Sequence, residues 1–364
     1  MTDETASAAH RQAVELSNGD GEVFGPLKGY HHETYAFSLP EGNPLGRRFQ
    51  RGKLRAPRPG VFWYDRRCFA SEDRLLTALK GRVSRIPDTV EVAENIFLQG
   101  FIEGAPPNAG ALPGRPLTAR HEQQLLQLFR ELVAVKTSEL DGVPRSCEPD
   151  GPGVDSEDSL GFLHRLISFT ENRVYRDGLD VYGEIFERLG VRGSALEALK
   201  APRRPFTERP YALVHGDLHR RNFIVDTTGD LWTIDWELAM IGDPLYELAT
   251  HLHLMRYARR DAQRIGAMWA QSVEGVLPGS SRGWERDLPH LLAFKRTQSV
   301  FTDVMRTARM LSDGTDPHWR GLPAAAWKVR RALVAAQRPL GLRGVPNLPQ
   351  VMTVYTEWWR AQAG

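Results

Sequence analysis

The chain has 364 residues, enough for one large domain or for two lobes that each bury a core. Its 47 Lys and Arg residues nearly balance 45 Asp and Glu residues, and a formal charge of +2 gives no reason to expect nucleic acid or an anionic membrane as partner. The two cysteines, Cys68 and Cys147, fit neither a metal-binding spacing nor a disulfide framework. No stretch approaches the roughly 18 apolar residues of a membrane span, and the first twenty residues lack a signal-peptide pattern, so a cytoplasmic protein is expected.

After a polar tail at 1–21, residues 22–102 are expected to form a small, strand-rich lobe. Short apolar runs at 35–39, 61–64 and 96–102 are separated by Gly and Pro, which is typical of strands and turns. The segment 71–80 differs, because its leucines recur at helical spacing behind a serine that favours a helix start. One helix is therefore expected within this lobe.

A Gly- and Pro-rich linker at 103–117 precedes a helical lobe at 118–364. Apolar residues recur at helical spacing in 118–139, and further helical regions are expected at 161–189 and 243–309. The polar, turn-rich segment 142–160 is expected to be a mobile excursion, and five prolines in 314–364 are expected to cut that stretch into short pieces. The outline is an α+β chain with a strand-rich N-lobe and a helical C-lobe.

The most informative stretch is 211–251. A strand candidate, YALV, leads into the polar loop HGDLHRRN, and two apolar runs, FIVD and LWTID, then flank a predicted four-residue turn at 227–230. This pattern predicts a hairpin that follows a polar loop.

In that hairpin Asp226 would pair with Leu231, and Asn222 would then face Asp235. Directly paired side chains have Cβ atoms roughly 4.5–5.5 Å apart, so an amide oxygen and a carboxylate would be placed to share a hard cation such as Mg²⁺. Asp217, five residues before Asn222 in the loop, would remain free to approach a hydroxyl group.

Phosphoryl transfer requires this set: metal ligands for the phosphates, and a separate carboxylate that orients or deprotonates the attacking hydroxyl. The loop HGDLHRRN at 215–222, followed by IDWE at 234–237 and GDP at 242–244, resembles the signature of the aminoglycoside phosphotransferase and choline kinase superfamily. The resemblance implies a two-lobed, protein-kinase-like fold and a phosphotransferase that uses ATP (or GTP) and Mg²⁺.

By this resemblance, Asp217 is the catalytic residue and His215 braces its loop. Asn222 and Asp235 are the implied metal ligands, and Asp243 is the implied cap of the following helix. Within the chain, the resemblance in sequence is confined to 211–251, and outside that stretch it is one of layout.

An alternative interpretation treats the histidines of this region as ligands of a transition metal. It would assemble His215, Asp217, His219, His251 and His253. This interpretation leaves Asn222 and the IDWE strand without a role.

The N-lobe of a kinase supplies a lysine for the nucleotide phosphates, paired with a carboxylate on a helix. Lys53 is expected to be this lysine and Glu72, in the helix at 71–80, its partner. Arg51 and Arg55 would share a face with Lys53 on a strand, so an arginine is the alternative in this position.

Two further nucleotide contacts are implied by the resemblance. The segment FLQGFIEG at 97–104 resembles the hinge between the lobes, where the Gly100 carbonyl and the Ile102 amide would meet the adenine edge. The segment GYHHETY at 29–35 would cover the phosphates, although it contains only one glycine.

The acceptor stays open. A polycationic aminoglycoside requires an acidic pocket. The predicted helical segment 287–309 instead contains both acidic and basic residues: Asp287, Lys295, Arg296, Asp303, Arg306 and Arg309. The first expectation is a hydroxylated small molecule, such as an antibiotic or another natural product. The alternatives are a Ser/Thr kinase for a peptide in natural-product maturation, and a nucleotide-binding pseudokinase, which the presence of Asp217, Asn222 and Asp235 disfavours.

Overall fold

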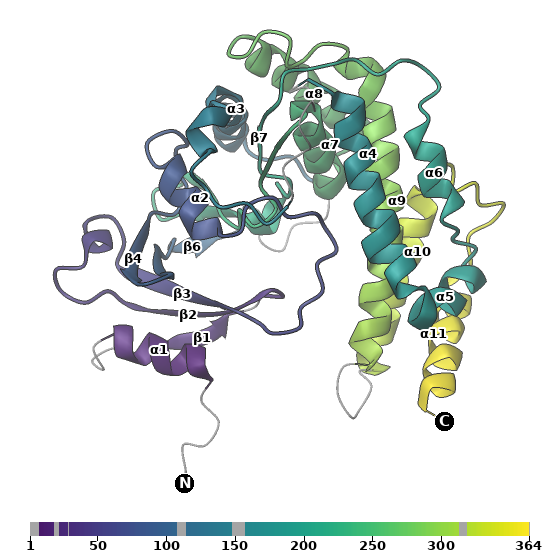
Figure 1. Cartoon of the computed structure of the whole chain (residues 1–364), viewed down its shortest axis with the longest axis horizontal. Helices are drawn as coiled ribbons and strands as arrows, with labels where there is room; N and C mark the ends of the chain where they lie inside the picture. Colours follow the sequence, from purple (N-terminus) through teal and green to yellow (C-terminus); the bar gives the residue numbers. More distant parts are fainter. Residues whose placement is uncertain are drawn as a thin grey trace.

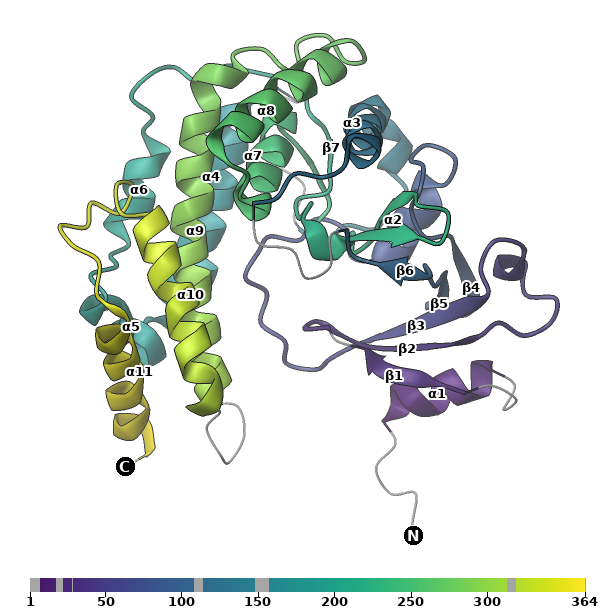
Figure 2. The ribbon, with the colours of Figure 1, turned by 180° about the vertical axis from the view of Figure 1, so that it is seen from behind.

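The computed structural model describes residues 7–17, 22–27, 29–107, 114–147, 157–312 and 319–363. The chain forms a smaller lobe of strands and a larger lobe of helices (Figure 1), as seen also from behind in Figure 2. This arrangement confirms the predicted two-lobed α+β class.

The N-lobe is built on a five-stranded antiparallel sheet in the order β1-β2-β3-β5-β4. Its strands are β1 (Phe24–Leu27), β2 (His32–Ser38), β3 (Arg51–Pro57), β4 (Thr89–Ala93) and β5 (Ile96–Gly100). Tyr35, Leu54 and Leu98 lie side by side across the three central strands and are buried. Because alternate residues of a strand face the same side, this row forms one apolar face of the sheet.

A helix packs on this sheet in the segment expected to be a tail. Helix α1 (Ala8–Leu16) contributes the buried residues Ala9 and Ala13 to the same core as the strand residues. The Ser7 side chain accepts a hydrogen bond from the His10 N–H at 3.1 Å and caps the helix. The tail predicted for 1–21 is therefore corrected at 8–16, where small residues on one face allow close packing on the sheet.

The loop between β3 and α2 (Glu72–Leu79) contains the run 61–64, which was predicted to be a strand and is not one. Its aromatic side chains pack individually instead: the ring of Phe62 contacts that of Tyr64 edge to face, and Trp63 stacks on His31 with ring centroids 3.8 Å apart. Burial through separate ring contacts thus replaces pairing in a sheet. The predicted helix is confirmed, with Ser71 as its cap.

The C-lobe begins with two small sheets that carry the polar loop. Strand β6 (Gly104–Ala105) pairs with β8 (Phe223–Asp226), which pairs with β9 (Leu231–Thr233), and β7 (Ala212–Val214) pairs with β10 (Met240–Gly242). The start of the predicted linker is therefore a strand of the C-lobe. Residues 108–113 of that linker, and 148–156 of the predicted excursion, lie outside the described residues.

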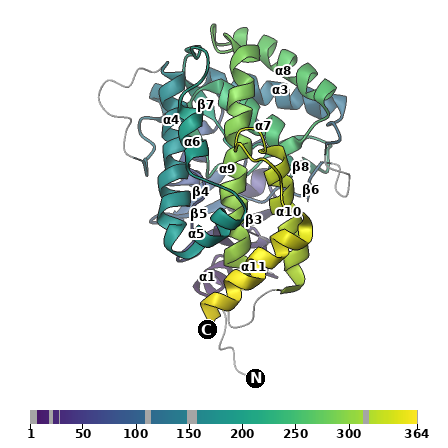
Figure 3. The same ribbon diagram turned by 90° about the vertical axis from the view of Figure 1, so that its right-hand side faces the viewer.

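The described C-lobe contains nine helices, and the longest of them, α9, contacts α4, α5, α6, α7, α10 and α11 (Figure 3). They are α3 (Ala119–Ala134), α4 (Ser159–Phe169), α5 (Leu179–Arg188), α6 (Ser194–Lys200), α7 (Pro244–Met255), α8 (Arg259–Glu274), α9 (Trp284–Ser312), α10 (Leu322–Ala335) and α11 (Leu348–Ala363). None of the helices in the described segments is both long enough and apolar enough to span a bilayer.

One expectation for this lobe is confirmed in outline, and another needs correction. The region 243–309 is three helices, and the first ends at Arg256, whose φ of 56° is left-handed. The region 319–363 contains two long helices rather than short pieces. Pro323 and Pro349 stand in the first turns of α10 and α11, where the missing N–H would have no helical partner in any case.

A fully buried arginine joins three parts of the C-lobe. The Nε and Nη2 atoms of Arg209 donate to the two carboxylate oxygens of Asp243, both at 2.8 Å. Its Nη1 donates to Asp287 Oδ2 at 2.9 Å and to the Arg282 carbonyl at 2.8 Å. Asp243 also accepts the Leu245 N–H at 2.8 Å, so it caps α7 as predicted. This network fixes the start of α7 against α9.

We expect Arg209→Met to destabilise the fold strongly, because it leaves the buried carboxylate of Asp243 without its cation and leaves Asp287 with only the more exposed Arg286. Breaking a buried ion pair in this way costs about 3–5 kcal/mol. Urea denaturation of the variant and of the exposed control Arg203→Met measures the difference. A loss below about 1 kcal/mol, which is the range of surface ion pairs, would contradict the structural role given to Arg209.

Candidate active site

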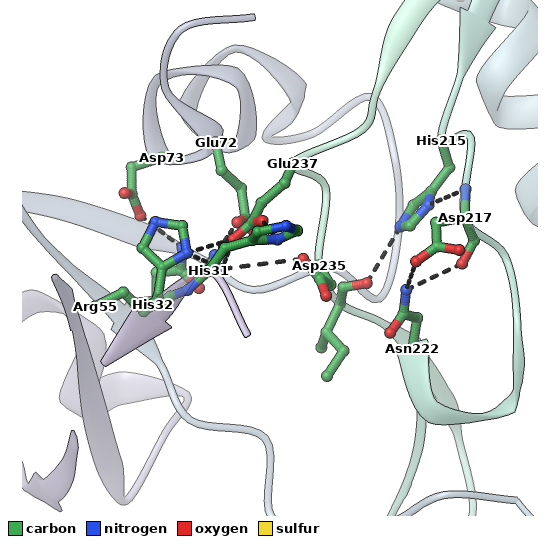
Figure 4. Close-up of polar contacts among 12 residues, drawn as sticks. His31, His32, Arg55, Glu72, Asp73, His215, Asp217, Asn222, Asp235 and Glu237 are labelled. Carbon is green, nitrogen blue, oxygen red and sulfur yellow. Dashed lines mark hydrogen bonds and ion pairs between the residues drawn. The ribbon is translucent and has the colours of Figure 1, made fainter. Parts of the chain in front are cut away.

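The polar loop between β7 and β8 holds Asp217 against Asn222. The Asn222 Nδ2 group donates to Asp217 Oδ2 at 2.9 Å and to the Asp217 carbonyl at 3.0 Å (Figure 4). Gly216 permits the bend before Asp217: its φ is 77°, and a Cβ atom there would lie 2.7 Å from the Leu238 carbonyl oxygen. Burial, and then the charge of Asp235, raise the pKa of Asp217 well above its ordinary value.

His215 braces the loop as a neutral ring. The Asp217 N–H donates to His215 Nδ1 at 3.3 Å, and His215 Nε2 lies 3.2 Å from the Ile234 carbonyl oxygen. An Nδ1 that accepts requires Nε2 to carry the proton, so the ring links the loop to the residue before Asp235. Burial lowers the pKa of His215 to about 3, which keeps the ring uncharged.

Glu247 of α7 is a functional residue that the sequence analysis missed. One of its carboxylate oxygens accepts the backbone N–H groups of His215 and Gly216, the latter at 3.0 Å. Burial raises the pKa of Glu247 to about 7. A carboxylate inside the apolar run of α7 was the available signal, because such a residue is seldom buried without a partner.

The hairpin has a register one residue away from the predicted one. Val225, rather than Asp226, pairs with Leu231, and the Asp226 N–H donates to the Asp230 carbonyl at 3.0 Å. The turn is therefore one residue shorter than predicted, and the left-handed Gly229 closes it with a φ of 81°.

As a result, Asn222 does not face Asp235 across the ladder. The Ile234 N–H donates to the Asn222 carbonyl at 2.9 Å, so Ile234 occupies the place expected for Asp235. Asp235 lies beyond the end of β9 with a left-handed φ of 67°. Figure 4 places Asp235 between the Asp217–Asn222 pair and a second cluster contributed mostly by the N-lobe.

That second cluster centres on Arg55 of β3. Its guanidinium group contacts the carboxylates of Glu72 and Glu237 and lies 3.9 Å from Asp235 Oδ1. The predicted partner of Glu72 was Lys53, and the structure pairs Glu72 with Arg55 instead. Lys53 and Arg55 share one face of β3, and the planar guanidinium group of arginine can bind two carboxylates at once.

Lys53 lies beside this cluster. Burial, and then the charge of Arg55, lower the pKa of Lys53 to about 8, whereas the charges of Asp235, Asp73 and Glu237 act to raise it. Among the cations of the N-lobe sheet, Arg55 acts on Asp235 more strongly than Lys53 does, and the ion pair expected between Lys53 and Glu72 is not found among the described residues.

Two histidines of the segment 29–35 complete the cluster. His31 Nδ1 lies 2.9 Å from Glu237 Oε2, and His32 Nδ1 lies 2.5 Å from Glu237 Oε1. Burial alone would raise the pKa of Glu237, but the two histidines and Arg55 outweigh it and hold the pKa well below its usual range. The doubled histidine was visible in the sequence, but its partner lies more than 200 positions away.

The oxygen atoms of this region fit a hard cation. Carboxylate oxygens of Glu72, Asp235 and Glu237 all lie within 4.8 Å of one another, and Glu72 Oε1 is buried without a hydrogen-bond partner in the described structure. Such an all-oxygen set suits Mg²⁺. Of the predicted ligands, Asp235 belongs to this group and Asn222 lies on its other side (Figure 4).

The histidines proposed for a transition metal have other partners. His251 lies within hydrogen-bond distance of the Leu218 carbonyl and the Tyr257 hydroxyl, and His253 lies 2.8 Å from Ser299 Oγ. In the described part of the chain, no metal-like group includes a histidine.

The predicted hinge residues lie at the end of the N-lobe sheet. Gly100 is the last residue of β5, and its N–H donates to the Asp88 carbonyl at 2.9 Å. A Cβ atom at Gly100 would come within 2.6 Å of three carbon atoms of the Phe49 ring, which explains the glycine. Ile102 lies between β5 and β6, in the connection between the lobes.

A cavity of about 1960 Å³ opens on the C-lobe side of the polar loop. Asp217 lies in its wall, and the remaining lining comes largely from the end of α7 and from α8, α9 and α10. A hydroxyl group of a molecule in this cavity can therefore reach the carboxylate of Asp217.

Comparisons with known proteins agree with this geometry. A family model described as the phosphotransferase enzyme family matches residues 26–286. An ethanolamine kinase of Plasmodium vivax has a TM-score of 0.51 at 10% identity over 90% of this chain and 86% of its own. The choline kinase LicA of Streptococcus pneumoniae has a TM-score of 0.51 at 14% identity over 91% and 100%. At such identities these two structures show the fold alone.

Macrolide 2'-phosphotransferase MphH of Brachybacterium faecium has a TM-score of 0.49 at 15% identity, over 93% of this chain and 98% of its own. A comparison with curated proteins gave no match. The family match spans most of the chain and includes the polar loop, Asp235 and the start of α7. As the resemblance of the loop predicted, the chain belongs to the phosphotransferase enzyme family.

Proposed function

We propose that this protein transfers the γ-phosphoryl group of ATP to a hydroxyl group of a small-molecule acceptor. The observation that carries the proposal is the placement of Asp217, which lines the large cavity on one side and is held by Asn222 on the other. Asp235 lies between this pair and the N-lobe cluster (Figure 4). The two sides supply what phosphoryl transfer requires: a carboxylate at the acceptor and charged groups at the phosphates.

In this proposal Asp217 orients the acceptor hydroxyl and takes its proton, to which its raised pKa is suited. Lys53 contacts the nucleotide phosphates, and Gly100 and Ile102 meet the base. Asp235 and Asn222, with Glu72 and Glu237 as further oxygen donors, would hold Mg²⁺, which when bound neutralises charge on the phosphates.

A Ser/Thr side chain of a peptide is the second candidate acceptor. The volume of the cavity, about 1960 Å³, favours it, because sites for small molecules are typically about 300–1,000 Å³. An extended substrate would occupy more of this space than a single small metabolite.

We expect Asp217→Asn to lower kcat for ATP turnover by about 10²–10⁴, the usual scale of general-base and orienting effects. Nucleotide affinity should hardly change, because Asp217 has no assigned contact with phosphate or metal. A coupled ADP-release assay measures both values, with the exposed Asp180→Asn as control. Full activity of Asp217→Asn would remove Asp217 from the mechanism.

Nucleotide binding should depend on Mg²⁺ through Asp235. Calorimetry with ATP should show tighter binding in the presence of Mg²⁺, and Asp235→Ala should abolish most of that gain because the cation loses a carboxylate ligand. Turnover that persists in excess EDTA, or Zn²⁺ bound at His215 and His219, would contradict the oxygen site.

Lys53→Met should raise the KM for ATP by about tenfold or more and lower kcat, because a charged contact to phosphate is lost. The matched control is Lys80→Met at the exposed end of α2, which should behave like the unaltered protein. Equal effects of the two substitutions in steady-state kinetics would mean that Lys53 has no specific contact with phosphate.

A further inference from the structure

Among the charged residues that line the large cavity beside Asp217, cations outnumber carboxylates. Four acidic residues line it, Asp65, Asp217, Glu285 and Asp303, against nine basic ones: Arg220, Arg221, Arg256, Arg259, Lys295, Arg296, Arg306, Lys328 and Arg331. One of the four carboxylates, Asp303, is already paired with Lys328 at 2.7 Å. A polycationic acceptor would thus be repelled by the excess of basic residues in the cavity wall, because like charges repel.

The deepest of these cations is Lys295 of α9. Its side chain is 6% exposed, and its ammonium group donates to the Tyr246 hydroxyl at 3.2 Å. Within the described residues it has no carboxylate within 4.0 Å, although the charges of Asp65 and Asp217 both act on it. A buried ammonium with three donors and one such partner retains capacity for an anionic ligand.

Arg331 of α10 lies in the same wall and packs against an aromatic ring. Its guanidinium carbon lies 4.4 Å from the centroid of the Trp327 ring, and both residues line the cavity. The pKa of Arg256 is lowered by burial and then by the charge of Arg331, so the two guanidinium groups are close enough to repel. The charge of Asp303 acts on both guanidinium groups, but this single carboxylate is already paired with Lys328. An anion placed between the two guanidinium groups would stabilise them further.

Arg220, at the base of the cavity, gives an independent indication. Both terminal nitrogen atoms of its guanidinium group are buried and have no hydrogen-bond partner among the described residues. Buried donors without acceptors are costly, and an acidic ligand would satisfy them.

From these contacts we infer that the acceptor of the proposed transfer is an anion: a hydroxylated compound that also carries carboxylate or phosphate groups, bound through Arg331, Arg256 and Lys295. The inference rests on the proposed function and assigns the substrate class of the same site. Two sources share this chemistry, an acidic small metabolite and a serine peptide rich in acidic residues. In this reaction the γ-phosphoryl group of ATP passes to the hydroxyl oxygen of the acceptor. The hydroxyl proton passes to Asp217, and ADP leaves.

The test measures affinity for acceptors that differ only in charge. Calorimetry is performed on the full chain, with and without ADP and Mg²⁺, at 0.15 M salt so that long-range attraction is screened. The probes are glycerol and glycerol 3-phosphate, a serine peptide flanked by glutamates and the same peptide flanked by lysines, and the polycation hygromycin B. We expect the anionic member of at least one pair to bind about tenfold or more tightly than its match, and the pair that responds identifies the source.

A matched pair of variants shows whether the cavity wall is responsible. Arg331→Gln should lower the anionic preference by about tenfold, because one charge-assisted hydrogen bond is lost. Arg330→Gln, adjacent on α10 but outside the cavity lining, should leave it unchanged within about twofold, because screened surface charges contribute little. Equal losses in both variants would reveal attraction to net charge only and would overturn the inference.

The inference would also be overturned if neither pair preferred its anionic member, or if hygromycin B or the lysine peptide bound most tightly. Failure of the proposed function is recognised separately. A chain that neither binds ADP with Mg²⁺ nor hydrolyses ATP contradicts phosphoryl transfer, while the titrations without nucleotide still decide whether the cavity selects anions.

Discussion

The buried carboxylate of Glu247 makes the interaction on which the polar loop at 215–222 depends. It accepts the N–H groups of His215 and Gly216 at the point where the chain leaves β7, and so anchors the loop to α7. The start of α7 is in turn fixed to α9 by the Arg209 network. The position of Asp217 is therefore set by the helical core and not by the loop alone, which is how a residue with a precise chemical role is held on an irregular segment.

Asp217 lies on one side of Asp235, and the carboxylates of Glu72 and Glu237 lie on the other (Figure 4). Burial is the main cause that raises the pKa of Asp217 and of Asp235. Glu237, by contrast, is kept ionised by His31, His32 and Arg55. The histidine contacts come from the segment expected to cover phosphates, so the N-lobe is tied to the C-lobe through Glu237. Arg55 binds carboxylates from both lobes, a role for which a bidentate guanidinium is better suited than an ammonium.

The cavity and the cluster around Arg55 differ in electrostatic character. At the position assigned to the nucleotide, the carboxylates of Glu72 and Glu237 are paired with Arg55 and with two histidines. Arginines and lysines instead outnumber carboxylates in the wall where an acceptor would lie. For the anionic acceptor that we propose, this distribution of charge would favour one orientation, with the anionic group toward α10 and the hydroxyl toward Asp217. The predicted helical segment 287–309 contains both acidic and basic residues. Which of these residues face the cavity follows from the packing of α9 against α7 and α10.

The sequence by itself determined the fold class, the helix that begins at Asp243 and the family, because these depend on local spacing: an apolar period, a capping residue, and a loop of fixed length between two strands. It did not determine the hairpin register, since the left-handed Gly229 shortens the turn by one residue and moves every pairing with it. Nor did it determine the partner of Glu72, the role of Glu247, or the helix at 8–16. Those depend on contacts between residues far apart in the chain, and only the tertiary structure decides which of several chemically suitable groups, Arg55 or Lys53, reaches a given carboxylate.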